Sequence, residues 1–320
     1  MSAKLLSVEG LSKDFSVAAS GFAAPRRLRA VEDVNFDLSP GETLGCVGES
    51  GCGKTTLGRM ILRLVEPSAG RIRFDGRDIT RLAEAEMRPL RRHLQVVFQD
   101  PFSSLNPRLR VRDIIAEPLQ NFGLDRPAID RRVAEVMEIV GLAPEYASRY
   151  PHAFSGGQRQ RIGIARALAL TPKLIVCDEA VSALDVSIQA QILNLLGDIQ
   201  RQFGLSLLFI SHNLAVVRHV SHRIAVMYLG RLVELASEEA LFERPLHPYT
   251  TALIGAVPEP DPKRRGKRQI LQGEMPSPLD PPTGCAFRTR CPKAEPKCRE
   301  LVPEFREVES GRWVRCHFPG

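Results

Sequence analysis

Residues 48–56 read GESGCGKTT, a stretch that fits the pattern GxxxxGK[ST]. The apolar run 43–47 before it predicts a buried strand, and residues 57–64 after it predict a helix. A strand, a glycine-rich loop and a helix start in this order form the context in which the pattern cradles phosphate groups. The sequence therefore predicts an α/β fold with a nucleotide triphosphate site at this phosphate loop, residues 48–56.

The chemistry of a triphosphate explains this choice of residues. Its negative charges need many donors at close range, and glycines let backbone N–H groups turn inward toward them. The helix dipole adds positive potential at the same place. Lys54 is expected to reach the β- and γ-phosphates, and the Thr55 hydroxyl to bind Mg²⁺. The expected nucleotide contacts are Gly48, Glu49, Ser50, Gly51, Cys52, Gly53, Lys54, Thr55 and Thr56. A glycine-rich turn that fits the pattern by chance is the alternative.

Composition restricts the class of protein. The 320 residues predict one large domain with an appendage, or two domains. With 43% hydrophobic and 25% charged residues, the chain is typical of a water-soluble globular protein. It has neither an apolar run long enough for a transmembrane helix nor the apolar region of a secretory signal, so a cytosolic location is expected. The net charge of +7 fits a solvated basic surface, with an anionic membrane or nucleic acid as the alternative.

Short strands are expected on both sides of the phosphate loop. Residues 5–11, 31–38 and 71–74 have strand-like apolar patterns. The stretch 18–29 between the first two contains basic residues, a glycine and a proline, and we expect it to be a loop.

Two carboxylates end a later apolar run. Residues 174–177 predict a buried strand, and Asp178 and Glu179 follow it directly. Because neighbouring side chains on a strand point to opposite faces, one carboxylate can serve Mg²⁺ while the other orients water. Capping of the next turn is the alternative role.

Two further polar side chains follow predicted strands. Gln99 comes after the apolar run 94–98, where it can reach Mg²⁺ or water, or can be an ordinary surface glutamine. His212 follows the apolar run 205–210, where it can contact a γ-phosphate or have only a structural role.

A second candidate anion site lies between these strands. Ser155 is a good N-cap for a helix that reaches residue 170, and Gly156 and Gly157 leave backbone N–H groups accessible. An ordinary capped helix is the alternative. Residues 101–150 before it predict an inserted helical region, with Ile129, Val133, Val136, Met137 and Val140 on one helix face.

The chain ends in a proline-rich extension, residues 236–320. The basic cluster 263–268 within it predicts a solvated linker or a contact with anionic lipid. Four of the seven cysteines lie here: Cys285, Cys291, Cys298 and Cys316. Four thiolates can bind Zn²⁺ or a [4Fe–4S] cluster, with His317 as an alternative ligand; four free thiols are the other possibility. Cys52 is a candidate reactive thiol, because it lies in an electropositive loop.

Taken together, these segments resemble the ATP-binding subunit of ABC transporters. The phosphate loop matches Walker A, Gln99 the Q-loop, and residues 155–158 (SGGQ) the signature motif. Asp178 and Glu179 match Walker B with its catalytic glutamate, Asp185 the D-loop, and His212 the switch histidine. The resemblance covers nearly all of residues 1–235. It implies a P-loop ABC ATPase cassette, with a mixed β-sheet core and a helical subdomain at about residues 101–170.

The resemblance also implies roles. Two such subunits pair head to tail, and each ATP is held between two chains. Glu179, Gln99 and His212 are the implied catalytic residues, and Thr55, Gln99 and Asp178 the implied Mg²⁺ site. Ser155, Gly156, Gly157 and Gln158 would contact the partner's ATP, and Asp185 would couple the two sites. Phe15 is the nearest match to the aromatic residue that stacks on adenine.

The amino-acid sequence around the motifs resembles that of the oligopeptide/dipeptide importer ATPases. Residues 97–101 (VFQDP), 104–107 (SLNP) and 247–249 (HPY) carry this likeness, and the phosphate loop looks like that of the F-type subunit. The resemblance implies a D-type partner ATPase, two membrane permeases, a solute-binding protein and a position on the cytoplasmic face of the inner membrane. It also implies that the four cysteines bind [4Fe–4S].

Three functions other than peptide import are the alternatives. Uptake of nickel, opines or sugars uses related systems, and the sequence does not reveal the solute. A non-transport ABC ATPase that acts on nucleic acid or ribosomes is less consistent with a single cassette, so no nucleic-acid partner is expected. A structural protein with a degenerate cassette is disfavoured because all six motifs are intact.

Overall fold

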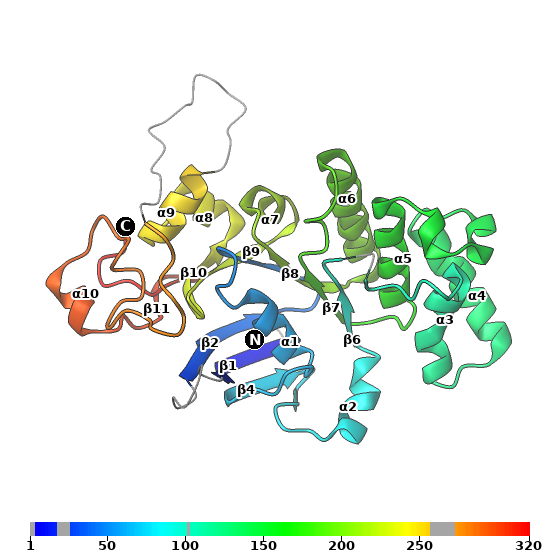
Figure 1. The fold of residues 1–320 in the computed structure, drawn as a ribbon, viewed down its shortest axis with the longest axis horizontal. Helices are drawn as coiled ribbons and strands as arrows, with labels where there is room; N and C mark the ends of the chain where they lie inside the picture. The colour runs from blue at the N-terminus through cyan, green and yellow to red at the C-terminus, as the bar shows by residue number, and fades with distance from the viewer. Residues whose placement is uncertain (1–3, 18–25, 101–102, 257–272) are drawn as a thin grey trace. The chain divides into compact units, whose positions relative to one another are not determined.

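The computed structural model describes residues 4–17, 26–100, 103–256 and 273–320 (Figure 1). The chain divides into two compact units, each of which is described by itself. The first unit contains residues 1–38, 43–81 and 211–320, and the second contains residues 39–42 and 82–210. The basic cluster 263–268 lies outside the described residues.

The first unit contains an antiparallel sheet in the order β2-β1-β4-β5. The strands of this sheet are β1 (Leu6–Val17), β2 (Arg26–Leu38), β4 (Ala69–Phe74) and β5 (Arg77–Asp78). Its apolar side chains Leu6, Leu11 and Leu38 are fully buried.

Five more strands of the first unit pair in the order β11-β12-β10-β9-β3, and only the β3–β9 pair is parallel. These strands are β3 (Thr43–Val47), β9 (Arg223–Tyr228), β10 (Arg231–Ser237), β11 (Arg306–Glu309) and β12 (Arg312–Val314). The helices of this unit are α1 (Lys54–Ile61), α7 (Leu214–Val220), α8 (Glu238–Glu243), α9 (Pro248–Gly255) and α10 (Pro296–Glu300). Strand β12 therefore extends the β9–β10 pair with residues from near the end of the sequence.

The second unit contains three parallel strands in the order β8-β7-β6 and a group of helices. The strands are β6 (Leu94–Val97), β7 (Leu174–Asp178) and β8 (Ser206–Ser211). The helices are α2 (Glu84–Arg91), α3 (Val111–Asn121), α4 (Arg126–Ile139), α5 (Gly156–Leu168) and α6 (Val186–Phe203), with short 3₁₀ turns at Pro144–Ser148 and Pro151–Ala153. Helix α3 packs against α4 and α5, so the expected helical region is present (Figure 1).

The helix after the phosphate loop begins earlier than expected. Residues 57–64 were predicted, whereas α1 starts at Lys54 and ends at Ile61. Gly53 is the N-cap, with φ 107° in the left-handed region. The glycine reverses the backbone, and Lys54 then begins the first helical turn.

The prediction of a loop over residues 18–29 is wrong for its last part. Residues 26–29 belong to β2 and pair with β1, so that Arg26 lies opposite Val17 and Leu28 opposite Phe15. Arg27 and Arg29 both form ion pairs with Asp14. Cross-strand pairs of opposite charge favour strand pairing, and the sequence pattern of a single segment does not reveal them.

No helix within the described ranges combines the length and the apolar character needed to cross a membrane.

Candidate functional site

The phosphate loop runs from the end of β3 to the start of α1. A Cβ atom on Gly53 would lie 2.2 Å from the carbonyl oxygen of Ala30, and one on Gly48 would lie 2.1 Å from that of Met227. Both distances are too short for a side chain, so the loop requires glycine at these two positions. The helix that follows directs its N-terminus at the loop, as in proteins that bind phosphate.

Lys54 is held inside this loop. Its side chain is almost fully buried, and its ammonium group donates to the carbonyl oxygens of Gly48 and Glu49 at 2.7 and 3.0 Å. A buried ammonium needs such partners, because an unpaired buried charge is costly. The loop backbone therefore fixes the position of the lysine charge beside the start of α1.

Phe15 lies on β1, and 36% of its surface is exposed. It lines a hollow of about 410 Å³ together with Asp14, Ser16, Arg26 and Arg27. The Lys13 ammonium lies 5.1 Å from the centre of its ring. An exposed ring in a hollow lined by cations is able to stack on a planar base.

In the second unit, Gln99 and Glu179 are brought together. The Gln99 amide donates to the Glu179 carboxylate at 2.9 Å. Glu179 has φ 51°, a left-handed conformation that is uncommon for a residue with a side chain. Its backbone N–H donates to Ile210 of β8 and its carbonyl oxygen accepts from the Ser182 N–H, so the strained turn is held at both sides. Strained residues of this kind cluster at functional sites.

Ser155 begins α5 with a capping box, as expected. Its hydroxyl accepts from the Gln158 N–H at 3.3 Å, and the Gln158 side chain accepts from the Ser155 N–H at 3.1 Å. Gly157 is buried, and a Cβ there would lie 2.4 Å from Ile188 of α6. Asp185 is exposed and precedes α6 as its N-cap. The SGGQ stretch therefore leaves Ser155 at the surface while Gly157 allows close helix packing.

The predicted residues are distributed over both units. The phosphate loop, Phe15 and His212 belong to the first unit, where His212 is exposed just after β8. Gln99, residues 155–158, Asp178, Glu179 and Asp185 belong to the second unit.

The four cysteines of the extension lie near one another. Burial, with a smaller effect of charge repulsion from the thiols of Cys298, Cys316 and Cys291, raises the pKa of Cys285 to about 11. Burial also raises the pKa values of Cys291 and Cys316. The Cys285 N–H donates to the Cys298 carbonyl oxygen at 2.8 Å, which ties the two ends of this segment together. All four are free thiols.

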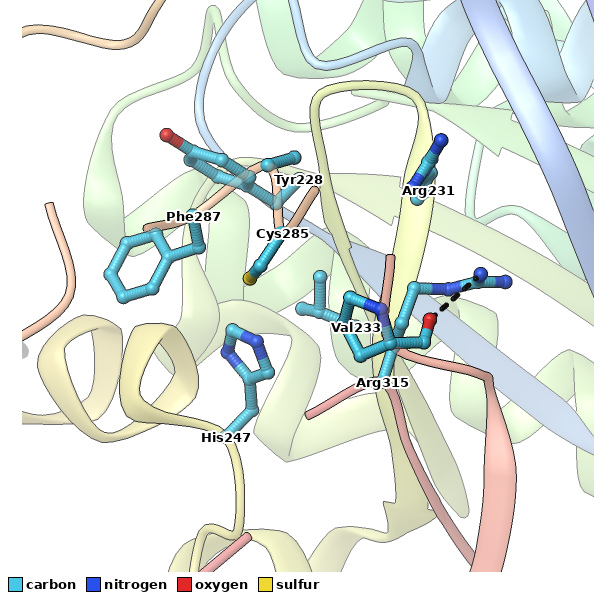
Figure 2. Close-up of a pocket in the computed structure, with 9 residues that line it drawn as sticks. Tyr228, Arg231, Val233, His247, Cys285, Phe287 and Arg315 are labelled. Atoms are coloured by element: carbon cyan, nitrogen blue, oxygen red, sulfur yellow. Dashed lines mark hydrogen bonds between the residues drawn. The ribbon is translucent and has the colours of Figure 1, made fainter. Parts of the chain in front are cut away.

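The metal prediction is not supported by the placement of these side chains. Among the described residues, no group of three or more His, Cys, Asp or Glu side chains is arranged to hold a metal ion. Figure 2 shows Cys285 beside the rings of Phe287, His247 and Tyr228, which line a cavity of about 10 Å³ with it. His317, the alternative ligand, instead contacts the Leu301 carbonyl oxygen at 3.0 Å.

The expectation of a reactive Cys52 is wrong. Its side chain is 1% exposed. Burial raises the pKa of the thiol despite the nearby Lys54 ammonium, so the reactive thiolate is disfavoured.

Two contacts of the phosphate loop could not be found from the sequence. The Glu49 N–H donates to the Tyr249 hydroxyl oxygen at 2.9 Å, and the Glu49 carboxylate accepts from Arg290 at 2.9 Å. Both partners lie in the C-terminal extension, 200 and 241 residues away along the chain. No local pattern indicates such a contact.

Comparisons with known proteins agree with these features. Residues 31–182 match the ABC transporter family model, and residues 233–298 match the model for the oligopeptide/dipeptide transporter C-terminal region. The chain is 56% identical to the "Probable peptide ABC transporter ATP-binding protein y4tS" of Sinorhizobium fredii, over 99% of this chain and 90% of that protein. It is 53% identical to the oligopeptide transport ATP-binding protein AppF of Bacillus subtilis, over 91% of this chain and 89% of that protein.

Solved structures share the cassette fold. CbiO1 of Clostridium perfringens, part of the ABC transporter complex cbiONQ, has a TM-score of 0.66 at 26% identity, covering 75% of this chain and 91% of that chain. The ATP-binding cassette MJ0796, in a dimeric post-hydrolysis state bound to ADP and Pi, has a TM-score of 0.65 at 26% identity. The match covers 73% of this chain and 98% of that chain. With its phosphate loop, capped SGGQ helix and matched C-terminal region, the chain belongs to the ABC transporter ATP-binding proteins of the oligopeptide/dipeptide transporter family.

Proposed function

We propose that this ABC ATPase energises the import of peptides. The observation that carries the proposal is the phosphate loop, with a buried Lys54 bonded to its backbone, in a chain whose C-terminal region matches oligopeptide/dipeptide transporters. Relatives at 53–56% identity are named for peptide or oligopeptide transport. Uptake of nickel, opines or sugars by the same ATPase chemistry is the alternative.

The phosphate loop is proposed to bind the triphosphate of ATP. Residues 48–56 supply backbone N–H groups and the Lys54 charge, and Phe15 stacks on adenine in its hollow. Thr55, Asp178 and Gln99 offer hydroxyl, carboxylate and amide oxygens, which are the ligand types that Mg²⁺ prefers. When bound, Mg²⁺ neutralises charge on the phosphate oxygens.

Glu179 is proposed to polarise the attacking water. Its turn is fixed by the hydrogen bonds to Ile210 and Ser182, and the Gln99 amide orients its carboxylate. His212 is proposed to contact the γ-phosphate. Positioning of a water molecule in line with the phosphorus, together with charge stabilisation, accounts for most catalysis of phosphoryl transfer.

A second ATPase subunit is proposed to complete each site. Ser155 is exposed at the start of a capped helix, and Gly156, Gly157 and Gln158 follow it, so this surface can contact ATP bound by a partner chain. Asp185 is proposed to couple the two sites. The solved cassette MJ0796 is described as dimeric. Here we propose a heterodimer of this F-type subunit with a D-type subunit.

Two membrane permeases and a solute-binding protein are the remaining proposed partners. They would place the chain on the cytoplasmic face of the membrane, without a nucleic-acid partner.

We propose residues 1–235 as the nucleotide-binding domain, with a helical subdomain at about 101–170, and residues 236–320 as the importer-type extension. The family match that begins at residue 233 supports this boundary.

We further propose that Cys285, Cys291, Cys298 and Cys316 hold a [4Fe–4S] cluster, with Zn²⁺ as the alternative. The charges of the other three thiols raise the pKa of Cys285, which indicates that the four thiols are neighbours and supports the proposal. A four-iron cluster spaces its thiolates more widely than a single ion does, since Zn–S bonds of about 2.3 Å draw four sulfurs close together. The absence of a single-ion arrangement among the described residues therefore disfavours Zn²⁺ more than it disfavours a cluster.

The peptide proposal is tested by uptake of radiolabelled dipeptides and oligopeptides in cells that lack this chain. Wild-type protein should restore uptake, and Glu179→Gln protein should not. Nickel, an opine and a sugar serve as comparison solutes. Restored uptake of a comparison solute, with peptide uptake unaffected by the chain, would contradict the peptide assignment and leave the ATPase assignment intact.

A further inference from the structure

Two side chains of the C-terminal extension form hydrogen bonds with Glu49 of the phosphate loop. The Tyr249 hydroxyl oxygen, from the second residue of α9, accepts from the Glu49 N–H at 2.9 Å. Arg290, from the cysteine segment 285–298, donates to the Glu49 carboxylate at 2.9 Å. Backbone and side chain of Glu49 are therefore held by two separate parts of the extension.

Glu49 in turn contacts the residue that carries the charge of the loop. Its carbonyl oxygen accepts from the Lys54 ammonium at 3.0 Å and from the Cys52 N–H at 3.3 Å. A shift of Glu49 would therefore move the acceptor that helps to place the Lys54 ammonium. Hydrogen bonds therefore connect Arg290 to Lys54 through a single residue, Glu49.

The two holding side chains are themselves fixed. Tyr249 is fully buried, and its ring lies 4.8 Å from that of Tyr228 and 5.4 Å from that of Phe287. The Arg290 side chain is 6% exposed, and its guanidinium lies 5.9 Å from the centre of the Tyr228 ring. The backbone N–H of Arg290 donates to the Phe287 carbonyl oxygen. The buried aromatic side chains Tyr228, Tyr249 and Phe287 thus give both contacts a rigid support; Figure 2 shows two of these rings beside Cys285.

A third part of the extension approaches the same loop. A Cβ on Gly51 would meet Met275 at 3.7 Å, an ordinary contact distance. Four residues later, the Leu279 carbonyl oxygen accepts from Arg26, which lines the Phe15 hollow. Residues 275–279 therefore run between the phosphate loop and that hollow.

From these contacts we infer that Arg290 and Tyr249 are positioning residues for ATP, which fix Glu49 and, through its carbonyl oxygen, the Lys54 ammonium. The extension thereby sets the affinity of the phosphate loop for nucleotide. Neither residue touches the reacting atoms, so the effect belongs to binding rather than to the chemical step. This inference rests on the proposed role of Lys54 in ATP binding.

The test measures the dissociation constant of ATP for the full-length chain, and kcat and KM in the assembled transporter. Arg290→Ala should weaken ATP binding by about tenfold, because the loop of the variant must be ordered at Glu49 when ATP binds, and ordering one side chain typically costs about 1 kcal/mol or slightly more. KM should rise accordingly, whereas kcat at saturating ATP should change little. Arg290→Lys keeps a charge beside Glu49 and should restore part of the affinity.

A double-mutant cycle separates coupling from general damage. Glu49→Ala should weaken binding as Arg290→Ala does, and the double variant should be no weaker than either single variant. Arg288→Ala is the matched control, because Arg288 lies in the same segment but donates to Thr283 within the extension. It should bind ATP like the wild type.

The outcomes distinguish this inference from the proposed function. If Lys54→Ala binds ATP normally, the proposed role of the phosphate loop is wrong. If Lys54→Ala abolishes binding but folded Arg290→Ala binds like the wild type, only the positioning role is overturned. Additive effects of Glu49→Ala and Arg290→Ala would overturn it as well. Fluorescence of Trp313, the one tryptophan in the chain, reports whether each variant is folded.

Discussion

Acid should destabilise the first unit through His247. This side chain is 1% exposed and caps α9, since its Nδ1 atom accepts from the Tyr249 N–H at 3.1 Å. Burial lowers the pKa of His247 from 6.5 to about 3. Protonation would remove the acceptor at Nδ1 and place a positive charge on a side chain that is buried from water, where an ionised group is costly. The folded state therefore excludes a proton that the unfolded chain binds.

The sign and size of the effect follow from linkage. Below pH 6.5 the unfolded chain takes up a proton at His247 and the folded protein does not, so stability is lost as the pH falls from about 6.5 toward about 3. Each pH unit in this window costs about 1.4 kcal/mol. At pH 5 the loss is about 2 kcal/mol, which is a large fraction of the stability of a typical domain.

The assay is urea unfolding followed by the fluorescence of Trp313, which lies on β12 in the same unit. The free energy of unfolding is compared at pH 7.5 and pH 5.0 for the wild type and for His247→Asn. Asparagine can still accept from the Tyr249 N–H as an N-cap but does not titrate. The variant should lose about 2 kcal/mol less than the wild type between the two pH values.

The comparison between the wild type and His247→Asn cancels the contributions of other titrating groups, because both proteins contain them. The Glu234 carboxylate accepts from the backbone N–H of His247, and burial raises the pKa of this carboxyl group. Because the folded protein then binds this proton more readily than the unfolded chain does, Glu234 stabilises the fold as the pH falls. Both proteins keep Glu234. His152→Asn, at an exposed position in the second unit, is the control for loss of a histidine. Equal losses for the wild type and His247→Asn would refute this reasoning.

Three further predictions concern the catalytic and structural residues. Glu179→Gln should bind ATP but hydrolyse it about 10²–10³-fold more slowly in the assembled transporter, and unchanged turnover would contradict the catalytic role. Cys298→Ser should lower the iron and sulfide content of anaerobically purified protein; equal iron in both proteins would exclude Cys298 as a ligand. Ser155→Ala removes the acceptor for the Gln158 N–H and should destabilise the second unit by about 1 kcal/mol, measured by urea unfolding followed by circular dichroism.

Local sequence determined the motifs and most elements of this protein. The GESGCGKTT stretch required a turn and a helix start, because glycine geometry and helix dipoles act over a few residues. Ser155 and Gln158 form their capping box within one helical turn, and Ile129, Val133 and Val136 are buried on one face of α4 as their spacing predicted. Such features depend on neighbours within one or two turns, so a sequence pattern contains them.

Tertiary structure decided the chemistry of individual side chains. Cys52 lies in a loop whose sequence suggests reactivity, but packing buries the thiol and raises its pKa. The pairing of residues 26–29 with β1 depends on Asp14 of the neighbouring strand. A pKa depends on the desolvation and charges that the whole fold imposes, and neither appears in a local pattern.

The link between the extension and the phosphate loop likewise arises only from the fold. Tyr249 and Arg290 contact Glu49 across 200 and 241 residues of chain. Sequence periodicity reflects which face of an element is buried, but it does not specify which distant side chain meets that face. By itself the sequence determined that the chain binds and hydrolyses ATP. Tertiary packing, which brings the ends of distant segments together, decided what holds the ATP-binding loop in place.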